Sequence, residues 1–355
     1  MNNKVLVAMS GGVDSAAAAL LIKSLGYDTA GITMKLFSEE ETVTDINSNL
    51  TNGDIEDAKK ISQKLEIPHF VVSFGDSFRI CVINKFISDY ENGATPNPCV
   101  ECNKHIKFGK LLEAATGMGY DRIATGHYAV TEQTPSGRYI IKKASDKSKD
   151  QSYVLWSLTQ DVLSRVILPL GKYKKSEIRE LAAKYCFDNA YKSDSQDICF
   201  IPDGDYASFI RNHSSFELPK ASFIDTDGNF LGENDGIIKY TIGQRKGLGI
   251  ALGKPMFVKC KDPVSNTVTL CEDSELYSRE LTASRINFIA CDDMYSPTRV
   301  QAKIRYKHEP ADATVIQTAP DKFKLRFDEP QRAIAKGQSV VLYDGDVLVG
   351  GGIID

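Results

Sequence analysis

The stretch Ser10-Gly11-Gly12-Val13-Asp14-Ser15 lies between a short apolar run, Val5 to Met9, and an alanine-rich run, Ala16 to Leu25. This order predicts a buried strand, a turn of small residues and a helix made of strong helix formers. Gly11 and Gly12 can adopt backbone angles that other residues avoid, and they place no side chain in a ligand's way. We therefore expect an anion to bind at the positive end of the helix, held by backbone N–H groups and by the Ser10 and Ser15 hydroxyls.

This phosphate loop is not of the Walker type, because the pattern G-x-x-x-x-G-K-[ST] occurs nowhere in the chain. The plainer alternative is an ordinary strand-to-helix turn, in which two glycines are common. In its setting after an N-terminal strand, the loop resembles that of the ATP pyrophosphatases (the PP-loop superfamily). These enzymes hold the pyrophosphate of ATP and transfer AMP to a substrate oxygen. The resemblance implies that the ATP-binding residues include Ala8, Met9, Ser10, Gly11, Gly12, Val13, Asp14 and Ser15.

Length and composition indicate an ordinary globular chain. Its 355 residues suffice for two or three domains, and 42% hydrophobic and 25% charged residues are typical of such proteins. No apolar run approaches the roughly 20 residues needed to span a bilayer. The N-terminus, Met1 to Lys4, leads directly into the first expected strand, so we expect no secretion signal and a cytoplasmic protein.

The charge is unevenly distributed. A net charge of −4 argues against a wholly basic nucleic-acid binder. The stretch from Gly236 to Lys261 nevertheless contains only basic charged residues: Lys239, Arg245, Lys246, Lys254, Lys259 and Lys261. Such a patch can bind a polyanion locally, or it can simply be a solvated face.

Strand and helix patterns alternate through the first two hundred residues. We expect strands at Val5–Met9, Thr29–Phe37, Phe70–Phe74 and Arg122–Thr125, and helices at Ala16–Leu25, Asp54–Leu65 with Asp54 as a cap, Ser77–Tyr90, Lys104–Ala115 and Lys174–Tyr185. Repeated βα units predict an α/β fold, a doubly wound parallel sheet with ligands at the carboxyl ends of its strands. The phosphate loop, Met34, the break at Thr95–Pro98 and Gly126-His127 all fall at such ends, which predicts one site.

The remainder of the chain has another texture. Ser38–Asn52 reads as a loop, Arg138–Lys143 as a short edge strand, Ser193–Asp197 as a polar turn and Tyr206–Arg211 as a short helix. From about Ser215 onward, turns separate short apolar runs, and alternating strands follow near the C-terminus with a hairpin signal at Asp344-Gly345. We expect a PP-loop domain (1–214), a small β-rich central domain (215–278) and a C-terminal β-barrel (279–355).

Eight cysteines suggest buried thiols, metal ligands or redox groups in a reducing compartment. Cys99-x-x-Cys102 is one pair without the second pair that a zinc site needs, and Cys199 is a third candidate thiol. Lys104 and Lys107 lie close to the pair, so we expect their thiolate forms to be favoured. We expect the others to be buried hydrophobes: Cys81, Cys186, Cys260, Cys271 and Cys291. His105 reads as a surface helix residue, whereas His127 could either contact the nucleotide or pack.

Several longer motifs, in this order, resemble those of the tRNA-specific 2-thiouridylase family (MnmA) over nearly the whole chain. They are the phosphate loop, Pro96-Asn97-Pro98 with Cys102 to Phe108, Thr125 to Tyr128, Lys149 to Tyr153, Asp194 to Ile201 and Tyr240 to Gly249. The resemblance implies ATP-dependent 2-thiolation of the wobble uridine of tRNA. Adenylation of the uracil C2 oxygen would turn a poor leaving group into AMP, and a sulfur nucleophile would then displace it.

Roles for individual residues also follow from the resemblance. Cys199 would receive a persulfide from a cysteine desulfurase or a sulfur-relay protein, and Cys102 would be the nucleophile, ending in a Cys102–Cys199 disulfide. Met34 and Gly126 would contact the adenosine part of ATP, which Mg²⁺ is expected to accompany. Asn97 would meet the target base of a tRNA reading Lys, Glu or Gln codons. The implied tRNA contacts are Lys149, Asp150, Gln151, Arg305 and Tyr306.

One position departs from the best-known members of the family, which have an aspartate where this chain has Cys99. That aspartate is proposed there as an acid–base group, a role that a thiol cannot fill in the same way. Cys99, Cys102 and Cys199 could instead ligate three irons of a [4Fe–4S] cluster that delivers the sulfur. Two other readings remain: a PP-loop enzyme that adenylates a small molecule, and a non-catalytic iron–sulfur or zinc RNA-binding protein.

Overall fold

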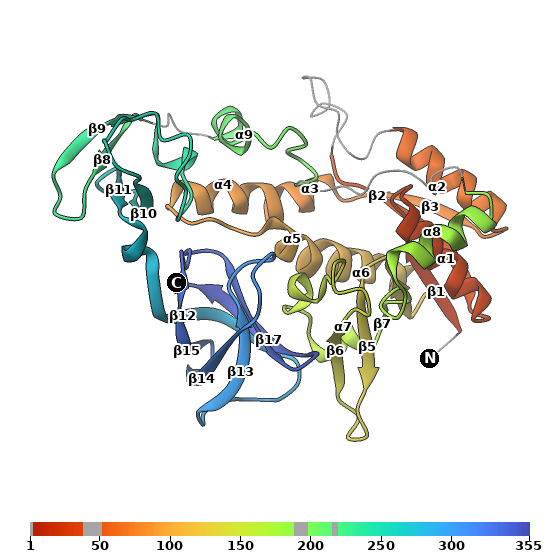
Figure 1. Cartoon of the computed structure of the whole chain (residues 1–355). Coiled ribbons are helices and arrows are strands. Elements are labelled where there is room, and N and C mark those ends of the chain that lie inside the picture. Colours follow the sequence, from red (N-terminus) through yellow and green to blue (C-terminus); the bar gives the residue numbers. More distant parts are fainter. Residues whose placement is uncertain (1–2, 38–51, 188–197, 215–218) are drawn as a thin grey trace. The chain divides into compact units, whose positions relative to one another are not determined.

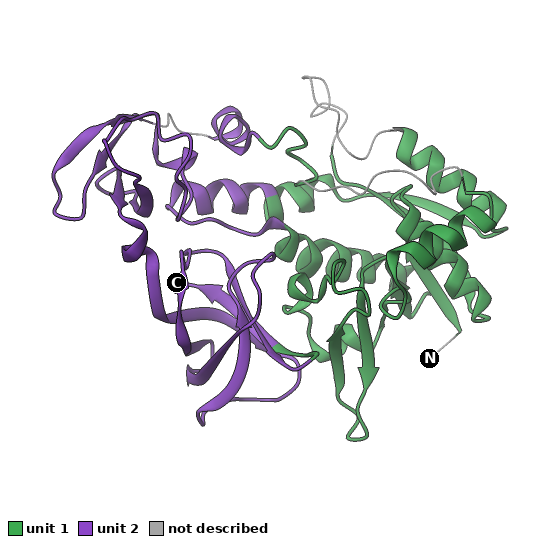
Figure 2. Ribbon diagram, in the orientation of Figure 1, with its two compact units in different colours: residues 1–82, 99–204, 346–349 green, residues 83–98, 205–345, 350–355 purple. Residues whose placement is uncertain are grey.

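The computed structural model describes residues 3–37, 52–187, 198–214 and 219–355 (Figure 1). Two compact units make up the chain (Figure 2). Unit 1 contains residues 1–82, 99–204 and 346–349, and unit 2 contains residues 83–98, 205–345 and 350–355. The expected polar turn Ser193–Asp197 and the expected loop Ser38–Asn52, up to its last residue, lie outside the described residues.

A five-stranded sheet forms the centre of unit 1, in the order β3-β2-β1-β4-β7, and all its pairs are parallel. This confirms the predicted α/β class. The strands are β1 (Lys4–Ala8), β2 (Asp28–Lys35), β3 (His69–Ser73), β4 (Arg122–Ala124) and β7 (Val166–Ile167).

Helix α1 (Val13–Ser24) packs in the core of this unit. Its alanines, Ala16 to Ala19, are fully buried, and the small side chains let neighbouring elements approach closely. Helix α8 (Lys175–Lys184) packs against it through Ile178 and Ala182. α8 has a capping box at Lys174, in which Glu177 accepts from the backbone N–H of Lys174 at 2.6 Å.

Helix starts differ from the sequence-based expectations. Helix α2 (Asn52–Lys64) begins two residues early, so Asp54 is a buried residue of its first turn and the prediction that it caps the helix was wrong. The helix expected at Lys104–Ala115 begins at Pro98, because proline fits the first helical position. It comprises α5 (Pro98–Glu101), a π-helical stretch η3 (Cys102–Lys110) and α6 (Leu111–Gly117). The helix expected at Ser77–Tyr90 likewise comprises α3 (Gly75–Phe78), π-helix η2 (Arg79–Ile83) and α4 (Asn84–Glu91).

A hairpin follows β4, and only its second strand was expected. Strand β5 (Ala129–Gln133) pairs with β6 (Tyr139–Lys143), and β6 pairs on its other side with Val347 and Leu348. The prediction of an edge strand at Arg138–Lys143 was therefore wrong, because β6 has a partner on both sides. Short helices complete this part of unit 1: η4 (Ser152–Leu155) and α7 (Gln160–Leu163).

Unit 2 contains helix α9 (Tyr206–His213), a small four-stranded sheet and a barrel. The small sheet has the order β10-β11-β8-β9, with β8 (Ala221–Ile224), β9 (Phe230–Asn234), β10 (Phe257–Asp262) and β11 (Thr267–Cys271). The barrel strands are β12 (Tyr277–Phe288), β13 (Thr298–Lys303), β14 (Ala311–Ala319), β15 (Lys322–Arg332), β16 (Ser339–Asp344) and β17 (Val347–Ile354). Pairing of β12 with β17 closes the predicted barrel, and the expected hairpin turn at Asp344-Gly345 joins its last two strands.

The described residues include the short 3-10 helices η4 in unit 1 and η5 (Ile237–Lys239) and η6 (Asp273–Leu276) in unit 2. Within the described part of the chain, every helix is too short or too polar to cross a membrane.

Candidate active site

The phosphate loop is shaped by backbone geometry that only glycine can supply at one position. Gly11 has φ +71°, and a Cβ added there would lie 2.5 Å from the carbonyl oxygen of Asp54. Gly12, at the N-cap of α1, has no side chain with which to cap the helix, so the N–H groups of the first turn remain directed at the loop. Such a helix start favours a bound anion such as a phosphate.

The two loop serines brace each other. The Ser15 hydroxyl donates to the carbonyl oxygen of Gly12 at 3.0 Å and accepts from the backbone N–H of Ser10 at 3.1 Å. The two hydroxyl oxygens lie 3.4 Å apart, and Ser10 is exposed while Ser15 is buried. Ser15 therefore fixes the turn, and Ser10 remains open to a ligand.

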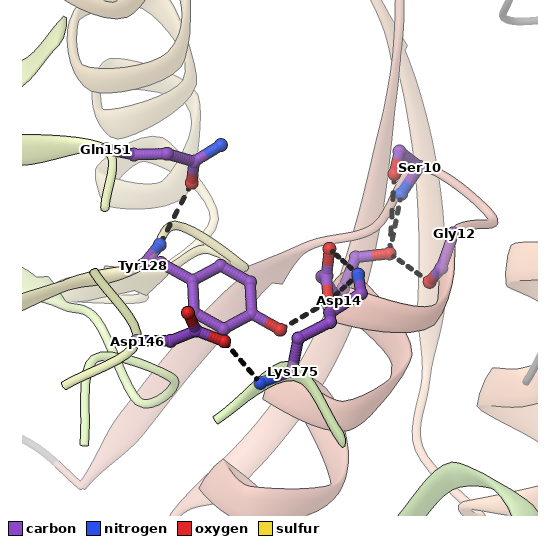
Figure 3. Close-up of polar contacts among 8 residues, drawn as sticks. Ser10, Gly12, Asp14, Tyr128, Asp146, Gln151 and Lys175 are labelled. Carbon is purple, nitrogen blue, oxygen red and sulfur yellow. Dashed lines mark hydrogen bonds and ion pairs between the residues drawn. The ribbon is translucent and has the colours of Figure 1, made fainter. Parts of the chain in front are cut away.

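Asp14 is held from two sides (Figure 3). The Tyr128 hydroxyl donates to its Oδ1 at 2.8 Å, and the Lys175 ammonium lies 2.7 Å and 2.8 Å from its two carboxylate oxygens. Lys175 is only 7% exposed and its Nζ lies 5.8 Å from the centre of the Tyr128 ring. A buried ammonium needs such a partner, so this carboxylate and this lysine stabilise each other.

Neither Lys175 nor the Tyr128–Asp14 contact was found from the sequence. Lys175 stands 161 positions from Asp14, and Tyr128 stands 114 positions from it. Lys175 begins a helix in which lysines are common, so nothing local marks it. Tyr128 ends the motif Thr125 to Tyr128, which could have drawn attention to it but named no partner.

The structure brings the other expected nucleotide contacts to the loop. Met34 lies near the carboxyl end of β2, and Gly126 lies two residues after the end of β4. A Cβ added at Gly126 would lie 3.0 Å from backbone atoms of both Asp14 and Ser15, so a side chain there would press on the loop. Ala8 ends β1, and the backbone N–H of Met9 bonds to the carbonyl of Ile32 at 2.8 Å. One edge of the sheet thus carries all four.

Cys99, Cys102 and Cys199 of unit 1 affect one another's pKa values through the charges of their thiolates. Cys99 is an exposed residue of α5, Cys102 is buried at the start of η3, and Cys199 is half-buried. Desolvation raises the pKa of Cys102 to about 11 and that of Cys199 to about 12, and the neighbouring thiols add to the effect. Lys107 opposes these shifts without overcoming them. The prediction that basic neighbours favour the thiolates was wrong, because burial outweighs the one lysine charge that acts on them.

The remaining cysteines do not all pack inside. Cys271 is buried and Cys81 and Cys291 are half-buried, but Cys186 and Cys260 are exposed. The expectation of five buried thiols was therefore wrong for these two. Cys186 follows the end of α8 with φ +55°, and Cys260 lies on β10, at the edge of the small sheet.

The described residues contain no group of three His, Cys, Asp or Glu side chains placed to hold a metal ion. In this arrangement Cys99, Cys102 and Cys199 therefore do not form a ligand set, and the cluster alternative gains no support.

The two histidines differ in their surroundings. His127 is buried, its Nδ1 lies 2.7 Å from the Thr125 hydroxyl and its ring centre lies 5.7 Å from that of Phe108. Burial, and to a lesser degree Lys107, holds the pKa of His127 well below its usual value. His105 lies at the surface, as expected, with Nε2 3.3 Å from a carboxylate oxygen of Glu101.

The segment 149–151 is firmly held within unit 1. The Asp150 carboxylate accepts from the Ala144 N–H at 2.9 Å, and Gln151 Oε1 accepts from the Tyr128 N–H at 2.9 Å. The backbone N–H of Lys149 bonds to the carbonyl of Asp146 at 3.0 Å. These expected tRNA-contact residues therefore also have a structural function, which links them to Tyr128.

The other expected tRNA contacts belong to unit 2. Next to Asn97, the Thr95 N–H bonds to the carbonyl of Lys336 at 2.8 Å, and Gln338 Nε2 donates to the carbonyl of Thr95 at 2.8 Å. Arg305 donates to the carbonyl of Arg332 at 3.2 Å. Tyr306 is 40% exposed, and the Lys303 ammonium lies 5.9 Å from its ring centre.

The basic stretch 236–261 is partly neutralised. Lys239, Lys254 and Lys259 each pair with a carboxylate, namely Asp235, Glu272 and Glu275. Lys261 is half-buried, and desolvation lowers its pKa to about 8. Arg245 and Lys246 are exposed and line a hollow together with Arg211, so part of this face remains available to an anion.

Comparison with known proteins identifies the family of the chain. Three family models match it in succession: a tRNA methyl transferase HUP domain over residues 3–203, a tRNA methyl transferase PRC-barrel domain over 207–272 and an aminomethyltransferase beta-barrel domain over 278–354. The tRNA-specific 2-thiouridylase MnmA of Clostridioides difficile (strain 630) is 48% identical over 100% of this chain and 99% of that protein. The chain belongs to the tRNA-specific 2-thiouridylase family.

Other members are equally similar. The 2-thiouridylase MnmA of Clostridium acetobutylicum is 47% identical over 100% of both chains, and that of Acetivibrio thermocellus is 47% identical over 99% of both. Among solved structures, a 4-thiouridine synthetase–RNA complex with bound ATP has a TM-score of 0.35 at 17% identity, over 59% of this chain and 50% of that one. That similarity is too low to add to the argument.

Proposed function

We propose that this chain is an ATP-dependent tRNA uridine 2-sulfurtransferase that acts on the wobble uridine. The observation that carries this proposal is the 48% identity to a 2-thiouridylase over the full length of both chains. The phosphate loop supports the proposal, since Gly11, the serines and the open start of α1 would suit the pyrophosphate of ATP.

In the first step the uracil C2 oxygen attacks the α-phosphorus of ATP, and pyrophosphate leaves. The loop would bind that pyrophosphate and favour its departure, while Met34 and Gly126 would contact the adenosine part. Mg²⁺ would accompany ATP, and Asp14 is the loop carboxylate that could hold it, because Mg²⁺ prefers carboxylate and phosphate oxygens. Lys175 would then have to move away from Asp14, or the Asp14 carboxylate would have to contact both Lys175 and the ion.

In the second step the terminal sulfur of a persulfide on Cys199 attacks C2, and AMP leaves. The Cys102 thiol then attacks the Cys199 sulfur, so the S–S bond to the substrate breaks and a Cys102–Cys199 disulfide forms. The sulfur that remains on C2 has gained two electrons, which the two thiols supplied. An external dithiol must reduce the disulfide, and a cysteine desulfurase or sulfur-relay protein must reload Cys199.

The raised thiol pKa values fit a site that waits for its substrates. At neutral pH both residues are protonated, so each must lose a proton when it reacts. A change in the surroundings of the thiols when the substrate binds would favour the loss of these protons. Protonated thiols are also poor targets for oxidation, which would preserve the free enzyme between turnovers.

Substrate and setting complete the proposal. The tRNA would be one that reads Lys, Glu or Gln codons, with its wobble base placed at Asn97 and its backbone at the segments 149–151 and 305–306. The chain would work in the cytoplasm, where it meets these tRNAs. The division into a PP-loop domain (1–214), a central domain (215–278) and a barrel (279–355) remains the organisation that we propose.

The experiment that tests this function is thiolation of an unmodified tRNA for glutamate, with ATP and a persulfide donor. We expect thiolated tRNA, pyrophosphate and AMP in equal amounts. Cys199→Ser should abolish thiolation but retain binding of ATP and tRNA, and Cys260→Ser, at an exposed thiol on β10, serves as the matched control. Pyrophosphate release that depends on a small molecule and not on tRNA would overturn the proposal.

A further inference from the structure

We propose that Tyr128 is a positioning residue that couples tRNA bound at segment 149–151 to the phosphate loop, so that tRNA and ATP bind cooperatively. This inference rests on the proposed function, because it takes tRNA and ATP as the two ligands. It concerns a residue that touches neither of them in our account, and it acts through Asp14 and Gln151.

Tyr128 contacts the loop and the segment with different parts of the residue. Its hydroxyl donates to Asp14 Oδ1 at 2.8 Å, in the first turn of α1. Its backbone N–H donates to Gln151 Oε1 at 2.9 Å, and its carbonyl accepts from the Gln151 N–H at 2.8 Å. Since Tyr128 is only 2% exposed, its ring cannot move without disturbing its neighbours.

A second connection runs parallel to the first. The backbone N–H of Lys175 donates to Asp146 Oδ2 at 3.0 Å, while its ammonium holds both carboxylate oxygens of Asp14. Asp146 in turn holds the segment, because its carboxylate accepts from the Ser148 hydroxyl at 2.6 Å and its carbonyl from the Lys149 N–H. Figure 3 shows Tyr128 and Lys175 converging on Asp14 from the side of Gln151 and Asp146.

The geometry makes Asp14 sensitive to the segment. Both groups that orient its carboxylate are themselves bonded to residues between 146 and 151. A displacement of that segment by the RNA backbone therefore changes the position of the Tyr128 hydroxyl, of the Lys175 ammonium, or of both. Asp14 would follow, and with it the first turn of the helix that receives the pyrophosphate. Coupling of this kind needs no movement of one unit against the other.

The plainer reading is that these bonds only hold the fold together. Under that reading, loss of the hydroxyl lowers stability or weakens each ligand alone, but does not change how one ligand affects the other. The quantity that separates the readings is the coupling factor, the Kd of nucleotide without tRNA divided by the Kd with tRNA. Coupling factors between linked sites are typically about 5- to 150-fold, and the factor must be the same when measured from the tRNA side.

The test measures both ligands by calorimetry or fluorescence on the full chain. The nucleotide is α,β-methylene ATP, which cannot transfer AMP, and the RNA is an unmodified tRNA for glutamate. We expect a coupling factor above about 5 for the unsubstituted chain and a fall by at least about threefold in Tyr128→Phe, which keeps the ring and loses the hydroxyl. Tyr120→Phe, at a half-buried tyrosine elsewhere in unit 1, should leave the factor unchanged.

Gln151 supplies an independent check should Tyr128→Phe fold poorly. Gln151→Met removes the acceptor for the Tyr128 N–H. We expect Gln151→Met to lower the coupling factor. In the double variant with Tyr128→Phe, the two losses should not add, because both changes interrupt one path.

Two results would overturn the inference: a coupling factor of 1 in the unsubstituted chain, or one that is the same in Tyr128→Phe and Tyr120→Phe. Either can occur in a chain that thiolates tRNA normally, so failure here is distinct from failure of the proposed function. Absence of thiolation by the unsubstituted chain would instead remove the proposed function itself.

Discussion

The phosphate loop and the cysteine site of unit 1 are prepared to different degrees. In the loop, Ser10, Asp14 and Ser15 already have hydrogen-bond partners, and the backbone conformation is fixed by Gly11. At the cysteine site, burial keeps Cys102 and Cys199 protonated, the form that does not attack. Folding alone therefore orders the loop, whereas the sulfur chemistry that we propose for the cysteines needs a further event.

The difference follows from the chemistry of each step. A phosphate needs N–H groups and hydroxyls, which are neutral and cost little to hold ready. A thiolate is a charge that burial disfavours, and a reactive one invites oxidation. A chain that forms thiolates only with substrate present would avoid both costs.

The largest effect should be on thiol reactivity. A pKa raised by two units for Cys102 and three for Cys199 lowers their thiolate populations roughly 100-fold and 1000-fold at neutral pH. We expect iodoacetamide at about pH 7.5 to modify the exposed Cys186 and Cys260 far sooner than either, as peptide mass spectrometry would show. The rates at Cys102 and Cys199 should rise about tenfold per pH unit up to about pH 10. A plateau below pH 9 would contradict protonated resting thiols.

The next effect concerns the backbone of the loop. Gly11→Ala combines a positive φ with a Cβ 2.5 Å from a backbone oxygen. We therefore expect the free energy of unfolding to fall by about 2–4 kcal/mol and ATP binding to be lost. Gly26→Ala has a positive φ but no atom within 4 Å, and should cost only about 1–2 kcal/mol. Urea unfolding and nucleotide titration measure both quantities.

Gly12→Ala is the matched control within the loop. Gly12 has φ −84°, and the nearest atom to an added Cβ is the Ser10 hydroxyl at 3.4 Å. We expect its stability to change by less than about 1 kcal/mol, because the backbone conformation suits alanine. Equal stability losses in Gly11→Ala and Gly12→Ala would show that the loop is not fixed by Gly11.

The sequence sufficed where function depends on neighbours along the chain. Apolar runs, small residues and helix formers located β1, the loop and α1, and the repeated βα pattern predicted the parallel sheet. The Asp344-Gly345 turn and the alternating strands gave the barrel. These features are local, so periodicity and turn chemistry report them directly.

The rest depended on contacts that no local pattern records. Lys175 contacts Asp14 across 161 positions of the chain, and β5 is a short, half-polar strand that pairs with β6. The thiol pKa values depended on how deeply Cys102 and Cys199 are buried, and burial reversed the effect expected from Lys107. The start of the cysteine helix at Pro98 could have been read from the preference of proline for that position.

A smaller effect should come from the charge pair behind the loop. Asp14→Asn leaves an acceptor for the Tyr128 hydroxyl but removes the charge that balances the buried Lys175. We expect the free energy of unfolding to fall by about 2–3 kcal/mol, less than for a fully buried pair because Asp14 is partly exposed. Glu132→Gln removes the partner of Lys142 in a half-exposed pair and should cost at most about 1 kcal/mol. Similar losses of unfolding free energy in Asp14→Asn and Glu132→Gln would contradict the view that the buried Lys175 depends on its carboxylate partner more than the half-exposed Lys142 does.

The smallest effect should appear at His127, which joins the two regions by following Gly126 and packing on Phe108. Its pKa is held well below the usual value, so as pH falls the unfolded chain takes up a proton there and the folded chain does not. Stability therefore declines below about pH 6.5, by at most about 1.4 kcal/mol per pH unit from this group. Urea unfolding should show a shallower decline in His127→Gln between about pH 7 and pH 5 than in the unsubstituted chain. An unchanged slope in His127→Gln would mean that the His127 ring takes up its proton in the folded state. Water would then reach this ring more easily than its packing on Phe108 indicates.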